Sequence, residues 1–90
     1  MATSTLTGKV ALVSGAAQGI GAALARRLAS DGAFVAVNDR EPSEALSALA
    51  VEIGGIAVPG DVSDPRRVGD VVRQASDAEG AIDILVANHA

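Results

Sequence analysis

The segment that most constrains this chain runs from residue 10 to residue 21, where an apolar strand leads through three glycines into a helix. A strand that ends at Gly15 can turn tightly. Gly19 and Gly21 lack the side chains that would keep a diphosphate away from the backbone or the helix away from the sheet. The unpaired N–H groups and the dipole of the following helix attract an anion. The segment therefore predicts a phosphate-binding turn, with an ordinary glycine-rich loop as the alternative.

An acidic residue at the end of the next strand supports the phosphate-binding interpretation. Residues 34–38 are of strand type, and Asp39 follows them. A carboxylate there accepts hydrogen bonds from both hydroxyls of an adenosine ribose and disfavours a 2′-phosphate. Two unit negative charges about 4 Å apart, one on the carboxylate and one on the phosphate, repel each other by roughly 4 kcal/mol at an effective dielectric constant near 20. The alternative for Asp39 is an exposed turn residue.

Two neighbouring residues bear on the choice of cofactor. Arg40 is able to turn toward a phosphate and compensate for the Asp39 charge. Gln18 is neutral and adds no positive charge in the glycine loop. The balance favours NAD, with NADP as the less favoured cofactor.

The rest of the chain alternates strand and helix patterns. Strand-like runs occupy residues 9–14, 34–38, 56–59 and 82–87. Apolar stripes at helical spacing lie between them, namely Gly21, Leu24, Ala25 and Leu28; Leu46, Leu49, Ala50 and Ile53; and Val68, Val71, Val72 and Ala75. Pro42 fits the first turn of the second helix, and Asp64-Pro65 fits the start of the third. The alternation predicts an α/β, doubly wound parallel sheet of the Rossmann type in the order 3-2-1-4, with no internal domain boundary in residues 1–90.

In that order the polar residues that follow the strands meet at one edge of the sheet. Asp61 and Val62 follow the third strand and Asn88 follows the fourth. Asp61 either accepts a hydrogen bond from the exocyclic amine of adenine or closes an Asx turn. His89 is the single histidine, and a packed or hydrogen-bonded role is favoured over catalysis.

Composition excludes several classes of function. The net charge of −4 without a basic cluster argues against a nucleic-acid partner. No run approaches the roughly 18 apolar residues of a membrane span. Cysteine is absent, so disulfides and thiolate chemistry are excluded and a reducing compartment is allowed. No metal site is expected, and the cytoplasm is the default compartment.

Taken in order, these motifs resemble the short-chain dehydrogenase/reductase family, in its compact, non-extended branch. Residues 6–10 and 14–21 are similar to the family's lead segment and its TGxxxGIG motif, with Ser14 in place of Thr. Residues 38–40 and 60–62 also match, and residues 83–90 are similar to DxLVNNAG. The resemblance implies that cofactor binding involves Ser14, Gly15, Gln18, Gly19, Ile20, Gly21, Asp39, Arg40, Asp61, Val62, Asn88 and Ala90. The end of the chain departs from the pattern, because His89 and Ala90 stand where the family has Ala and Gly.

The family's catalytic Ser, Tyr-x-x-x-Lys and Asn lie after the closing motif, and this chain has no tyrosine. The resemblance implies that residues 1–90 are the N-terminal, cofactor-binding part of a single Rossmann-type domain. The complete protein would be an NAD(P)-dependent oxidoreductase that interconverts an alcohol and a ketone and forms a homo-oligomer, a dimer or tetramer. No catalytic residue is assigned within the chain. The alternative is a non-catalytic nucleotide-binding or interaction module, although the last strand would then leave an unpaired apolar edge.

Overall fold

Strands and helices alternate along the whole described chain, as predicted. The structure, a computed structural model, describes residues 5–88. Its elements are β1 (Val10–Val13), α1 (Gly19–Ser30), β2 (Phe34–Val37), α2 (Glu44–Ile53), β3 (Ile56–Ala57), α3 (Pro65–Glu79) and β4 (Ile84–Val86). Each strand is shorter than the apolar run that predicts it, because residues at the ends of the runs, among them Lys9, Ser14, Asn38 and Pro59, lie outside the strands.

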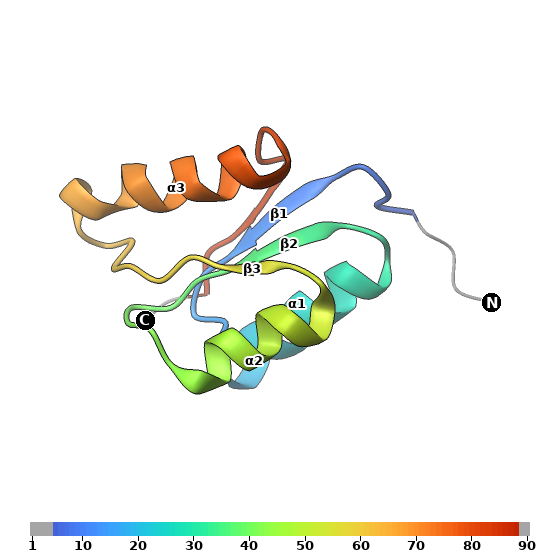
Figure 1. Cartoon of the computed structure of the whole chain (residues 1–90), viewed down its shortest axis with the longest axis horizontal. Coiled ribbons are helices and arrows are strands. Elements are labelled where there is room, and N and C mark those ends of the chain that lie inside the picture. The colour runs from blue at the N-terminus through green and yellow to red at the C-terminus, as the bar shows by residue number, and fades with distance from the viewer. Residues whose placement is uncertain (1–4, 89–90) are drawn as a thin grey trace.

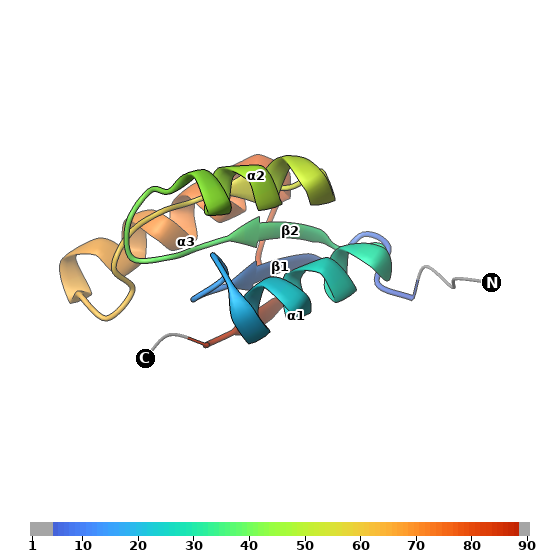
Figure 2. The same ribbon diagram turned by 90° about the horizontal axis from the view of Figure 1, so that it is seen from below.

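The four strands form one parallel sheet in the order β3-β2-β1-β4, which confirms the predicted topology. In the register, Ala11 of β1 lies opposite Val35 of β2 on one side and Ile84 of β4 on the other. The connection through α3 runs from the β3 edge to the β4 edge. It covers the face opposite α1 and α2 (Figure 1). Figure 2 looks from the side of α1 and α2, with α3 behind the sheet.

Two apolar clusters, one on each face of the sheet, form the core. On the α1 and α2 face, Ala11 and Val13 of β1 pack with the buried residues of both helices. On the α3 face, Leu12 packs with Val71 and Ala75. All four residues of β1, including Val10, are buried, as expected for a central parallel strand covered on both faces.

Local capping explains where α2 and α3 begin. The Ser43 hydroxyl oxygen accepts a hydrogen bond from the Leu46 N–H at 3.1 Å, so α2 starts at Glu44 and Pro42 lies before the cap rather than in the first turn. The Asp64 carboxylate accepts from the Arg66 N–H at 2.9 Å, and Pro65 is the first residue of α3, as predicted. Both caps satisfy N–H groups that have no partner within the helix.

Three residues of the predicted apolar stripes are exposed instead of buried: Leu24 at 38%, Val68 at 37% and Val72 at 39%. Leu24 precedes Ala25, and α1 meets the sheet through its small residues. On α3 only Val71 and Ala75 are buried. Helical spacing places a residue near the buried side, but the width of the contact with the sheet decides whether it is covered.

The β4 edge is open in the described part of the chain. β4 pairs with β1 on one side, and no second strand of residues 5–88 pairs with it. Leu85 at its centre is 66% exposed. The unpaired apolar edge expected from the sequence is therefore present.

Candidate functional site

The loops that follow β1, β2 and β3, together with the end of β4, enclose a cavity of about 310 Å³. In Figure 1 these loops lie at the same end of the sheet. The volume is at the lower end of the range of about 300 to 1,000 Å³ for small-molecule sites. Its lining residues are Gly15, Asn38, Asp39, Arg40, Gly60, Asp61, Val62 and Asn88. Six of these eight are among the residues singled out from the sequence; Asn38 and Gly60 are not.

Asn38 lines the cavity and joins the loops that follow β2 and β3. It is 1% exposed, and its side-chain amide donates hydrogen bonds to the carbonyl oxygens of Val58, at 2.8 Å, and Gly60, at 3.0 Å. The Gly60 N–H donates in return to the Asp39 carbonyl at 2.9 Å. Sequence reasoning assigned Asn38 no role in the site, although an amide side chain at the end of an apolar strand is the signal that marks it.

The carboxylate of Asp39 connects β2 to the glycine turn. One oxygen, Oδ2, accepts a hydrogen bond from the Ala17 N–H at 3.1 Å, and Oδ1 accepts from the Arg40 N–H at 2.7 Å. Each oxygen has two lone pairs, so both keep capacity for a further donor. Asp39 is half-buried and holds the turn in place, so it is more than an exposed turn residue.

Asp61 forms the Asx turn that was one of its two interpretations. Its Oδ1 accepts from the Ser63 N–H at 3.0 Å and from the Ser63 hydroxyl at 2.6 Å. The residue also lines the cavity, so the turn and a contact with a ligand are compatible. Its Oδ2 lies 4.0 Å from Nε of Arg40, which joins the loops after β2 and β3 by a long ion pair.

Hydrogen bonds and close packing join the end of β4 to the glycine turn. The Asn88 N–H donates to the Ser14 hydroxyl oxygen at 2.9 Å, and that hydroxyl donates to the Val86 carbonyl at 3.3 Å. Ser14 is 3% exposed, so its hydroxyl lies inside this link. A Cβ on Gly15 would overlap the Asn88 carbonyl, and a Cβ on Gly21 would overlap the Gly15 carbonyl. The turn is compact because both positions lack a side chain.

Residues 18–20 at the start of α1 are exposed and are not among the residues that line the cavity. Gln18 is the N-cap residue of α1 and makes no side-chain capping hydrogen bond, unlike Ser43 and Asp64 at the other two helices. Gly19 has φ +65° and open space where a Cβ would lie. Ile20 is 71% exposed. The predicted site residue Ala90, and His89 before it, lie outside the described residues.

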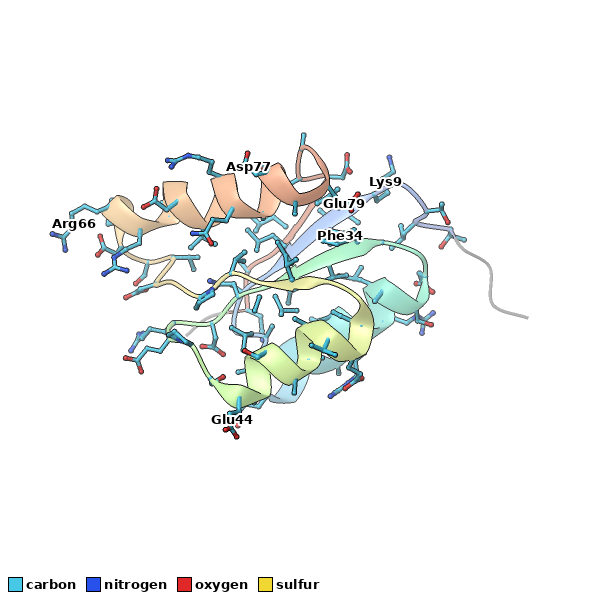
Figure 3. The ribbon with its side chains drawn as sticks, viewed as in Figure 1. Lys9, Phe34, Glu44, Arg66, Asp77 and Glu79 are labelled. Carbon is cyan, nitrogen blue, oxygen red and sulfur yellow. The ribbon has the colours of Figure 1, made fainter. Side chains whose placement is uncertain are left out.

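Two surface ion pairs outside the cavity shift the pKa of their acids. The hydrogen bond from Arg26 lowers the pKa of Glu52 below its usual range, and the two side chains are 2.7 Å apart. The hydrogen bonds from the side chain and then the backbone of Arg66 lower the pKa of Asp64. Figure 3 shows Arg66 at the start of α3, pointing away from the sheet. These two arginines therefore serve surface contacts, and Arg40 is the basic residue that lines the cavity.

Within residues 5–88, no three His, Cys, Asp or Glu side chains gather closely enough to hold a metal ion. The helices of this same part are all too short or too polar to cross a membrane.

Comparison with known proteins gives the same family along most of the chain. The sequence profile of the short chain dehydrogenase family matches residues 9–90. A short-chain dehydrogenase/reductase of Armillaria gallica is 45% identical, over 96% of this chain and 35% of its own length. The oxidoreductase UcpA of Escherichia coli K12 is 44% identical, over 92% of this chain and 33% of its own.

The fold comparison agrees. The crystal structure of a dehydrogenase/reductase from Sinorhizobium meliloti 1021 superimposes with a TM-score of 0.88 and 36% identity, covering 96% of this chain and 36% of that one. The chain therefore spans about a third of the length of the relatives it matches. With its parallel sheet, its glycine turn and the profile match over residues 9–90, this chain belongs to the short-chain dehydrogenase family.

Proposed function

We propose that the chain is the cofactor-binding part of an NAD-dependent oxidoreductase that interconverts an alcohol and a ketone. Membership of the family implies a nicotinamide nucleotide cofactor. The observation that carries the choice of NAD is the position of Asp39, whose carboxylate lines the cavity and is bound to the Ala17 N–H of the glycine turn. A carboxylate there suits the two hydroxyls of an adenosine ribose and repels a 2′-phosphate.

The described residues fit such a cofactor. Asp39 would hold the ribose, and Asp61 with the Val62 N–H would hold adenine, at the cavity that all three line. The N–H groups at the start of α1, which Gln18 leaves without a side-chain cap, would hold the diphosphate. When bound, the nicotinamide exchanges a hydride with a carbinol or ketone carbon. The part of these residues is binding and orientation, and we assign no proton transfer to them.

Binding of NADH and NADPH to the full-length protein tests this function. We expect NADH to bind more tightly, and Asp39→Ala to narrow the ratio of the two dissociation constants by about tenfold, because charge-assisted hydrogen bonds to the ribose are lost. Asp77→Ala, near the far end of α3 (Figure 3), removes the same charge away from the cavity and should leave the ratio unchanged. An unchanged ratio in Asp39→Ala would contradict the assignment of NAD.

Oxidation of NADH in the presence of small ketones and aldehydes tests the catalytic part of the proposal. Loss of absorbance at the nicotinamide band is expected in the full-length protein. Tight NADH binding without turnover of any carbonyl compound would favour the second candidate, a nucleotide-binding module. The 90 residues contain no tyrosine, which favours that second candidate for the chain by itself.

We further propose a small alcohol or ketone as substrate, a homo-oligomer and a cytoplasmic location, with neither nucleic acid nor membrane as a partner.

A further inference from the structure

Arg40 is the cavity-lining residue whose charge opposes that of Asp39. Its backbone N–H is bound to Asp39 Oδ1 at 2.7 Å, so the start of its side chain is fixed beside that carboxylate. The guanidinium is paired with another residue that lines the cavity: its Nε lies 4.0 Å from Oδ2 of Asp61. The side chain is 69% exposed, which leaves it room to move.

Asp61 is oriented for this pairing by its own turn. Its Oδ1 is bound to both the N–H and the hydroxyl of Ser63. Two hydrogen bonds to one oxygen fix the plane of the carboxylate, so Oδ2 faces Arg40 without a further loss of side-chain freedom. The Asp61 carboxylate is thus already oriented for the ion pair, and the flexible partner is the Arg40 side chain.

We propose that Asp61 is a specificity-determining residue that holds the Arg40 guanidinium away from the ribose 2′ position. The inference rests on the proposed function, because it requires the adenosine ribose to lie at Asp39. A 2′-phosphate brings about two negative charges into a cavity that already has two carboxylates. Arg40 is positioned to neutralise it only after leaving Asp61. A 2′-hydroxyl is uncharged and does not require Arg40 to leave Asp61, so the Arg40–Asp61 pair adds to the preference for NAD.

The ion pair is weak, so its expected effect on the choice between NADH and NADPH is modest. Its partners are 69% and 40% exposed and 4.0 Å apart. Exposed pairs of this kind change an equilibrium by about 1.5- to 5-fold. We therefore expect Asp61→Asn to raise the affinity for NADPH relative to NADH by about two- to fivefold. Asparagine keeps the oxygen that accepts from Ser63, so the turn is retained and only the charge is lost.

Dissociation constants for NADH and NADPH, measured by titration of the full-length protein, form the test. The ratio of the two constants is the readout, because a loss of contact with adenine weakens both ligands equally and cancels. Arg40→Gln and the double variant Arg40→Gln/Asp61→Asn complete a cycle. If Asp61 acts through Arg40, Asp61→Asn changes the ratio in the wild-type background and leaves it unchanged when Arg40 is replaced.

Two results would overturn the inference while the proposed function stands. The first is that the protein binds NADH, but Asp61→Asn leaves the ratio of the NADH and NADPH dissociation constants unchanged. The other is an equal change of ratio with and without Arg40, which would show that Asp61 acts only as a nearby negative charge. Failure of the wild-type protein to bind either nucleotide would instead reject the proposed function, and the inference with it.

Discussion

Gly15 meets two separate demands at the residue scale. Its φ is +64°, in the region that disfavours side chains, and a Cβ there would overlap the backbone carbonyl of Asn88. The sequence predicts the tight turn, because a glycine follows the strand. The contact with Asn88 comes from a residue 73 positions later, so it depends on the pairing of β4 with β1.

We predict that Gly15→Ala destabilises the protein by about 2 kcal/mol or more, since it adds steric overlap to an unfavourable backbone conformation. Gly54→Ala is the matched control, because Gly54 has φ +69° and open space around it. In Gly54→Ala the free energy of unfolding should fall only by the cost of the unfavourable backbone conformation, about 1 kcal/mol. Urea unfolding of the two variants measures the difference, and equal losses would show that the Asn88 contact contributes nothing.

At the scale of the elements, local chemistry determines where a helix begins or ends, whereas the neighbouring sheet determines which of its faces is buried. Gly54 ends α2 in the left-handed conformation and Pro65 opens α3, both from local chemistry. The exposed positions of Leu24 and Val72 depend on the distance and width of the sheet beneath each helix. Local sequence carries no record of that distance, so spacing alone overestimates the buried stripe.

The cap of α2 gives a prediction at this scale. Ser43→Ala removes the oxygen that accepts from the Leu46 N–H and should lower the free energy of unfolding by about 1 kcal/mol. Ser47→Ala changes the same side chain at an exposed position inside the helix and should be neutral or slightly stabilising. Thermal unfolding followed by circular dichroism compares them. If Ser47→Ala destabilised the protein as much as Ser43→Ala, the result would contradict the assignment of Ser43 as the cap.

At the scale of the whole molecule, the described sheet is asymmetric. β3 is a two-residue strand at one edge, whereas β4 at the other edge presents Leu85 at 66% exposure. A short edge strand limits pairing with other chains, and an exposed apolar one promotes it. The open side of the sheet is therefore the β4 side.

We predict that Leu85→Lys reduces self-association of the 90-residue chain, because a charged side chain on an edge strand opposes pairing. Val51→Lys is the control, since Val51 is 82% exposed but lies on α2, away from the edge. Sedimentation over a range of concentrations should show weaker association for Leu85→Lys and no change for Val51→Lys. Equal behaviour of the two variants would place the association elsewhere.

The sequence by itself determined the strand and helix alternation, the parallel order, the glycine turn and the acid at the end of β2, because each depends on local spacing or on the handedness of short connections. It also identified six of the eight residues that line the cavity. The tertiary structure decided that Asn38 joins the loops, that Ser14 is buried in the link to β4, and that Arg40 pairs with Asp61. These contacts join loops that are distant in the chain, and only the register of the folded sheet sets the distances between them.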